Sequence, residues 1–101
     1  MMKATVLYNH PLDPQAFERY YAQTHLPLAA KMAGVARLEL TRFAPGPDGT
    51  RPAFYRMAEL YFADAAQMQT TLGSPEGQAA VGDLKNFATG GVTVLTGAVE
   101  S

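Results

Sequence analysis

The order of strand-like and helix-like periodicity along the 101 residues constrains the fold more than any other feature of the sequence. Four stretches combine β-branched and aromatic residues, and one of them alternates apolar and polar residues with a period of two. The predicted strands span residues 3–9, 35–43, 53–62 and 92–99, and the helical regions lie between them. This order predicts an α+β fold of ferredoxin-like βαββαβ type. Two right-handed crossings place both helices on one face of a four-stranded antiparallel sheet.

Each predicted helix begins at a residue whose side chain can cap it. Asp13 begins the first helix, Asp64 the second, with Gln67 three residues on, and Ser74 begins a short continuation of the second. Proline directly follows Asp13 and Ser74, at the one helical position where its missing N–H loses no hydrogen bond.

Length and composition exclude several classes of protein. A chain of 101 residues fits one domain, 1–101. The absence of cysteine excludes disulfides, thiolate metal sites and cysteine nucleophiles, and two histidines without a matched carboxylate spacing give no metal signature. Eight basic and nine acidic residues give no charge pattern for nucleic acid, and no apolar run is long enough to span a membrane. With no targeting segment visible, we expect a cytoplasmic protein.

The sheet face turned away from the helices should be polar if it met water, yet the alternation places apolar side chains on it. Leu7, Leu95 and, from the third strand, Tyr55, Met57 and Tyr61 fall on this face. A large bare apolar face needs a partner, and a second copy related by two-fold symmetry is the simplest one. We therefore expect a homodimer formed through the sheet face.

His25 is the residue best suited to proton transfer near neutral pH. Pro27 has no N–H to donate, so the first helix should kink or break beside His25 and turn its side chain out of the helix. Tyr21 lies one turn earlier, where its phenol is in reach to orient the imidazole. The alternative is that His25 only caps a backbone carbonyl at the kink. His10, in an Asn-His-Pro turn, is a weaker candidate.

Two other polar side chains need an interpretation. Tyr20 and Tyr21 are adjacent and point about 100° apart on a helix, so we expect Tyr20 in the core rather than at the same site as Tyr21. Glu59 lies among aromatic and apolar neighbours on the third strand, where a carboxylate is unfavourable unless paired. Arg37, on the neighbouring strand, is its candidate partner.

The stretch 20–28, YYAQTHLPL, resembles the YY-x-x-T-H-x-P-L motif of the EthD family. The resemblance continues in the same order over most of the chain, at Tyr8, 58–62, 74–78 and 83–87. Members of that family are small and have the dimeric α+β barrel fold, so the resemblance implies such a barrel here. Many members carry the label reductase, which no cofactor motif in this sequence supports.

The resemblance also implies a site. In a lactone isomerase that is similar around this motif, the motif histidine, here His25, lines the active pocket, although the cysteine of that isomerase has no counterpart here. Together with the strand alternation, this implies a pocket between the sheet and the first helix, with His25 as general acid or base and Tyr21 orienting it. The expected ligand-binding residues are Tyr8, Asn9, Met57, Glu59 and Phe87.

The expected substrates are small apolar carbonyl, lactone or aromatic compounds of catabolic or secondary metabolism, handled without a cofactor. Two alternatives stay open: a ligand-binding or assembly protein whose barrel is merely filled, or a protein that binds haem with His25 as axial ligand. An open, polar-tipped cavity at His25 favours catalysis. A His25 bonded to backbone, with no adjacent void, favours the non-catalytic alternative.

Overall fold

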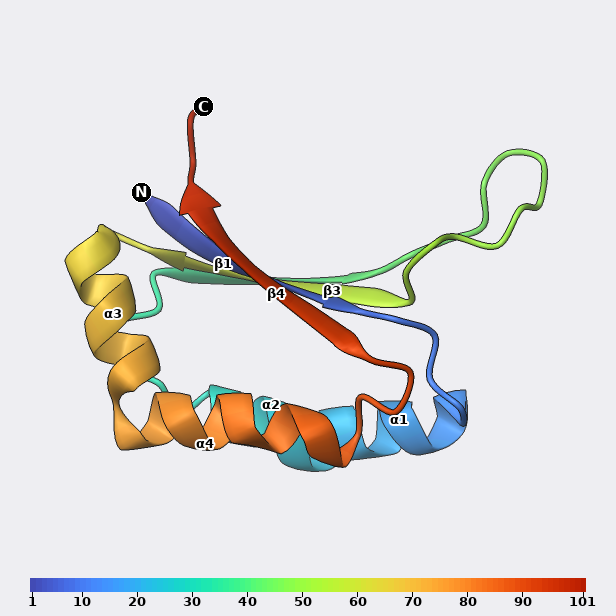
Figure 1. Ribbon diagram of the computed structural model, residues 1–101, viewed down its shortest axis with the longest axis horizontal. Coiled ribbons are helices and arrows are strands. Elements are labelled where there is room, and N and C mark those ends of the chain that lie inside the picture. The colour runs from blue at the N-terminus through green and yellow to red at the C-terminus, as the bar shows by residue number, and fades with distance from the viewer.

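The computed structural model describes residues 1–101 and has the strand and helix order that the periodicity predicts (Figure 1). The elements, in chain order, are β1 (Met2–Tyr8), α1 (Pro14–Tyr20), η1 (Tyr21–His25), α2 (Leu26–Ala29), β2 (Arg37–Arg42), β3 (Arg56–Phe62), α3 (Ala65–Gly73), α4 (Pro75–Asp83), η2 (Leu84–Asn86) and β4 (Val92–Ala98). The strands form one antiparallel sheet in the order β2-β3-β1-β4. The helices lie on one side of this sheet, which confirms the ferredoxin-like α+β fold (Figure 1). None of them combines the length and the apolar character that a membrane span requires.

The three predicted helix starts are confirmed. The side chain of Asp13 accepts the N–H of Ala16, and Asp64 accepts that of Gln67. Ser74 accepts the N–H of a residue three positions on, in the same way. The Gln67 side chain does not return to its cap but donates to Thr71 Oγ1 at 3.0 Å, so the capping arrangement at α3 is one-sided.

The first helical region does not break at Pro27 but widens into a π-helical turn before it. The N–H of Leu26 reaches back five residues to the carbonyl of Tyr21, which is the π-helical pattern. Proline is tolerated at the start of the following α2, because its missing N–H needs no intrahelical partner there. The wide turn leaves both Tyr21 and His25 buried.

The outer face of the sheet carries polar pairs that the strand alternation does not predict. On the outer face, turned away from the helices, Glu59 pairs with Lys3 at 2.7 Å, and the Tyr61 hydroxyl donates to Glu39 at 2.9 Å. The outer face therefore carries ion pairs beside its apolar side chains. The prediction of Arg37 as the partner of Glu59 is wrong, because Glu59 pairs with Lys3 and Arg37 with Glu39.

Tyr55 lies on the helix side, where its ring packs against Phe17 at 5.1 Å between centroids. The prediction that placed Tyr55 on the outer face is wrong, because β3 begins only at Arg56 and the alternation does not extend to the residue before it.

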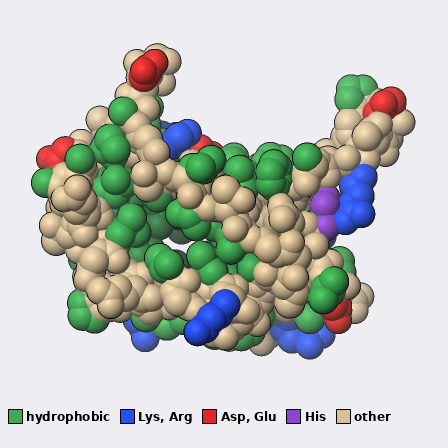
Figure 2. Space-filling view, viewed as in Figure 1, with side chains coloured by type: hydrophobic (Ala, Val, Ile, Leu, Met, Phe, Trp, Pro, Cys, Tyr) green, Lys and Arg blue, Asp and Glu red, His purple; other side chains and the backbone are tan.

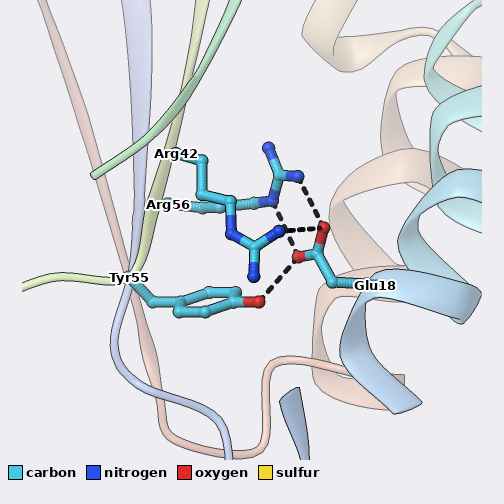
Figure 3. A network of polar contacts seen from close by, with 4 residues as sticks. All are labelled: Glu18, Arg42, Tyr55 and Arg56. Atoms are coloured by element: carbon cyan, nitrogen blue, oxygen red, sulfur yellow. Dashed lines mark hydrogen bonds and ion pairs between the residues drawn. The ribbon is translucent and has the colours of Figure 1, made fainter. Parts of the chain in front are cut away.

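An ion-pair network fastens the helix layer to the sheet at the α1 end (Figure 3). Glu18 of α1 accepts hydrogen bonds from Arg56 Nε at 2.9 Å and from Arg56 Nη2 at 2.6 Å, one on each carboxylate oxygen. The Tyr55 hydroxyl donates to the same carboxylate at 2.9 Å, and Arg42 lies 3.7 Å away. A bidentate arginine–carboxylate pair fixes both distance and orientation. The buried hydrophobic residues form one cluster at this end of the sheet and a second cluster at the α3 end.

Candidate functional site

A cavity of about 80 Å³ lies between the sheet and the helices, between the two clusters of the core. All four strands contribute side chains to it, together with η1, α2 and α4. Of its 17 lining residues only His25 is not hydrophobic, so the wall of the cavity is almost entirely apolar. Leu38, Leu40, Val81 and Val94 line it and are 42–50% exposed, so it is open at its rim. Figure 2 shows this hollow, with hydrophobic side chains inside it.

His25 reaches the cavity from the last residue of the π-helical turn and is hydrogen-bonded to a carboxylate. Its Nδ1 lies 3.0 Å from Asp83 Oδ2, and both side chains are buried, 8% and 7% exposed. Asp83 is the last residue of α4, and its other oxygen, Oδ1, accepts the Tyr20 hydroxyl at 2.6 Å and Asn86 Nδ2 at 2.9 Å. The His25 side chain contacts a carboxylate rather than a backbone carbonyl, so the interpretation of His25 as a carbonyl cap at the kink is wrong.

The surroundings of Asp83 keep its carboxylate charged. Burial works to raise the pKa of Asp83, but the hydrogen bonds from Tyr20, Asn86 and His25 outweigh burial and hold that pKa below its ordinary value. An ionised Asp83 can only accept, so in the neutral form of the imidazole the proton is on Nδ1. Nε2 then carries a lone pair, and it makes no hydrogen bond within the protein. The arrangement presents a base to the cavity and places a counter-charge behind it.

Tyr21 touches His25, but in a different way from the prediction. The two rings stack with their centroids 5.8 Å apart and an interplanar angle of 14°. The Tyr21 hydroxyl is buried and makes no hydrogen bond. The group that orients the imidazole by hydrogen bonding is Asp83, while Tyr21 and Phe87 pack against its ring.

The other predicted ligand-binding residues separate into two groups. Tyr8 lines the cavity, and Phe87 lies behind it with its ring centroid 4.6 Å from that of His25. Asn9 lies outside, where its side chain donates to the carbonyl of Gly90 at 3.1 Å. Met57 and Glu59 do not line the cavity, because β3 pairs them with Leu7 and Thr5 on the outer face.

His10, the second histidine, holds the loop between β2 and β3. Its Nε2 lies 2.7 Å from the carbonyl oxygen of Pro52, and its ring contacts Tyr55. The structure has no group of three or more His, Cys, Asp or Glu side chains arranged to hold a metal ion.

Sequence reasoning missed Asp83 and placed Tyr20 only in the core. Tyr20 is half-buried, and its hydroxyl bonds the carboxylate that orients His25. A signal for Asp83 exists in the spacing of the buried residues of α4, which are Gly77, Ala80 and Asp83. That period of three places a carboxylate on the inner side of the helix, where it requires a partner.

Comparison with known proteins identifies relatives over nearly the whole chain. Residues 9–91 match the EthD domain. An uncharacterized 11.0 kDa protein from the thcB–thcC intergenic region of Rhodococcus erythropolis is 43% identical over 99 residues, which cover 94% of this chain and 91% of that protein. The crystal structure of an EthD family protein from Bacillus halodurans is 35% identical and covers 99% of both chains with a TM-score of 0.91. Hydroxynitrile lyase from Passiflora edulis, 13% identical, has a similar fold, with a TM-score of 0.74 over 98% of this chain and 94% of that one.

Proposed function

Because the chain belongs to the EthD family, we propose that it is an enzyme that moves a proton at a carbon next to a carbonyl group. The substrate is a small apolar carbonyl, lactone or aromatic compound, and the reaction is an isomerisation, cyclisation or dehydration that needs no cofactor. The observation that carries the proposal is the hydrogen-bonded pair of His25 and Asp83 at the wall of an otherwise apolar cavity.

The proposed chemistry follows from the two nitrogens of His25. Nε2 takes a proton from the carbon next to the carbonyl, and the electrons of the broken C–H bond form an enolate. The imidazolium that results is stabilised by the Asp83 carboxylate on Nδ1, 3.0 Å away. The same Nε2 then returns the proton at another atom of the substrate, so no net charge or proton is gained. A positioned base of this kind contributes roughly 10²–10⁴-fold to a rate.

Deuterium exchange tests this step without knowledge of the natural product. Cyclohexanone, a small enolisable ketone, is incubated with the protein in D₂O, and loss of its α-proton signal is followed by NMR. We expect the protein to accelerate exchange above the buffer rate, and His25→Gln to lose about 100-fold or more of that acceleration. His10→Gln is the matched control, because His10 lies on a loop away from the cavity and should exchange like the wild type.

Wild-type exchange that survives in His25→Gln would contradict the proposed role of His25. Absence of exchange in the wild type, with cyclohexanone bound, would favour the alternative of a binding protein.

We also propose that the protein is a homodimer through the outer sheet face. On this face Leu7 and Met57 are half-buried, Tyr61 is buried, and Leu95 is 54% exposed. Their apolar surface supports association despite the ion pairs around it. We expect light scattering after size exclusion to give a dimer for the wild type and a monomer for Leu95→Glu. Leu12→Glu is the control, because Leu12 is 85% exposed and lies in a loop away from this face. A monomeric wild type would contradict the proposal.

A further inference from the structure

Tyr8 holds a fixed place at the wall of the cavity. It is the last residue of β1 and is 1% exposed. Its ring is surrounded by the rings of Phe17, Tyr21 and Phe87, with centroids 5.3, 5.7 and 5.6 Å away. Aromatic packing on several sides leaves this side chain little freedom, so its hydroxyl is presented in one position.

The Tyr8 hydroxyl makes no hydrogen bond with any group of the protein. The Tyr21 hydroxyl is also without a partner, and it is enclosed by the surrounding atoms. The cavity is the only pocket of the structure that Tyr8 lines. Tyr8 and His25, which both line one apolar cavity, therefore each carry a polar atom without a protein partner, Oη in Tyr8 and Nε2 in His25. Buried polar atoms in native proteins usually have a hydrogen-bond partner, so we infer that a bound ligand supplies the partners of these two atoms.

The Tyr8 hydroxyl and His25 Nε2 require different hydrogen-bond partners. Burial raises the pKa of the Tyr8 hydroxyl, so it stays protonated at neutral pH and acts as a donor. Nε2 of His25, with the proton of the ring on Nδ1, acts as an acceptor. A ligand that satisfies both offers an oxygen to Tyr8 and a removable proton to His25. An enolisable carbonyl compound has these two features on neighbouring atoms.

We propose that Tyr8 is the hydrogen-bond donor that binds the carbonyl oxygen of the ligand and selects oxygenated compounds over hydrocarbons of the same shape. The proposal deepens the function proposed above and rests on it for the class of ligand. In the reaction, negative charge develops on that oxygen as the enolate forms, so a donor already in place stabilises the transition state more than the ground state.

A pair of probes of nearly the same shape tests the selection by binding alone. Cyclohexanone has a carbonyl oxygen where methylenecyclohexane has a CH₂ group. The affinity of each is measured by NMR titration of the labelled protein. We expect the wild type to bind the ketone roughly three- to tenfold more tightly, the value of one neutral hydrogen bond. We expect Tyr8→Phe to bind the two compounds equally well.

Tyr21→Phe is the matched control, because it removes an enclosed hydroxyl from the same aromatic cluster. It should keep the preference for the ketone. Circular dichroism and thermal melting establish that both variants are folded. Equal binding of the two probes by the wild type, no binding of either at millimolar concentration, or a preference retained in Tyr8→Phe would each overturn the proposal.

The binding measurement also separates this proposal from the proposed function. His25→Gln should retain the ketone preference while losing deuterium exchange, because His25 acts on the C–H bond and Tyr8 on the oxygen. A wild type that prefers the ketone but does not exchange its protons would refute the catalytic proposal and leave the role of Tyr8 in place. Exchange with no ketone preference would refute the role of Tyr8 alone.

Discussion

Replacing Tyr21 by phenylalanine should stabilise the protein, although it deletes a polar group from a buried aromatic cluster. Tyr21 lines the cavity but is 2% exposed, and its hydroxyl is buried without a protein partner. A buried hydroxyl without a hydrogen bond destabilises a fold by about 1–3 kcal/mol. The void left by one oxygen atom offsets part of this gain. We therefore expect a net stabilisation of about 1 kcal/mol, which raises the Tm of a domain of this size by roughly 4–8 °C.

The neighbouring tyrosine supplies the control for this prediction. Tyr20 is in the same helical region, but its hydroxyl donates to Asp83 at 2.6 Å. The same substitution, Tyr20→Phe, removes a hydrogen bond to a charged acceptor and should lower the Tm. Both variants and the wild type are melted at one protein concentration, because association makes the Tm depend on concentration. Urea unfolding then gives the free energies.

Opposite signs for the two variants are the result that the reasoning requires. If Tyr21→Phe lowered the Tm as much as Tyr20→Phe does, the Tyr21 hydroxyl would have a stabilising partner, and the account of it as an unpaired group would be refuted. A loss of Tm in Tyr21→Phe alone would refute the account of Tyr20 as well.

Three further predictions concern activity, pH and packing. Asp83→Asn should lower the rate of cyclohexanone exchange by about 10²–10⁴-fold in the NMR assay, because the counter-charge of His25 is lost. Hydrogen bonds from Arg56 outweigh burial and hold the pKa of Glu18 below its ordinary value. The ionised Glu18 therefore stabilises the fold at pH values above the unfolded-state pKa. This stabilisation is lost as pH falls through the lower pKa of the folded state. The acid limb of a Tm-against-pH curve should thus be shallower in Glu18→Gln, and an unchanged limb would contradict this. Within α4, Gly77→Ala should lower the free energy of unfolding, measured in urea, by about 1–3 kcal/mol, because its Cβ would overlap backbone atoms at the end of α3. Gly82→Ala is the control: its Cβ meets open space, and it should raise the free energy of unfolding by up to about 1 kcal/mol.

The fold was largely predictable because its signals are local. Strand alternation, the capping residues Asp13, Asp64 and Ser74, and the order of the elements each depend on residues close in sequence, and the structure confirms them. The π-helical turn was not predictable in the same way. Pro27 indicates that the regular pattern must fail nearby, but tertiary packing decides whether the helix breaks or widens.

The expectation that Met57 and Glu59 line the pocket conflicted with the strand alternation. The period of two already placed Met57 with Tyr61 on the outer face, and Glu59, between them in the alternation, belongs to the same face. Pairing of Leu7 with Met57 and of Thr5 with Glu59 places both on the face opposite to Tyr8. The sequence did contain a warning: a carboxylate beside an apolar cavity needs a cation, and Glu59 pairs with its cation, Lys3, on the outer face.

The partner of His25 was hidden for a different reason, since 58 residues separate it from Asp83. The first helical region and α4 lie side by side on one face of a small sheet. The hydrogen-bond partner of the buried His25 is therefore expected on the inner side of α4. Asp83 is buried on that inner side, as is Ala80 one turn before it. The glycine at position 77 decides this, because its missing side chain lets α4 approach the end of α3 closely and turns the row of Gly77, Ala80 and Asp83 inward. A row of small residues that ends in a carboxylate is therefore the pattern that predicts an orienting acid in a chain of this kind.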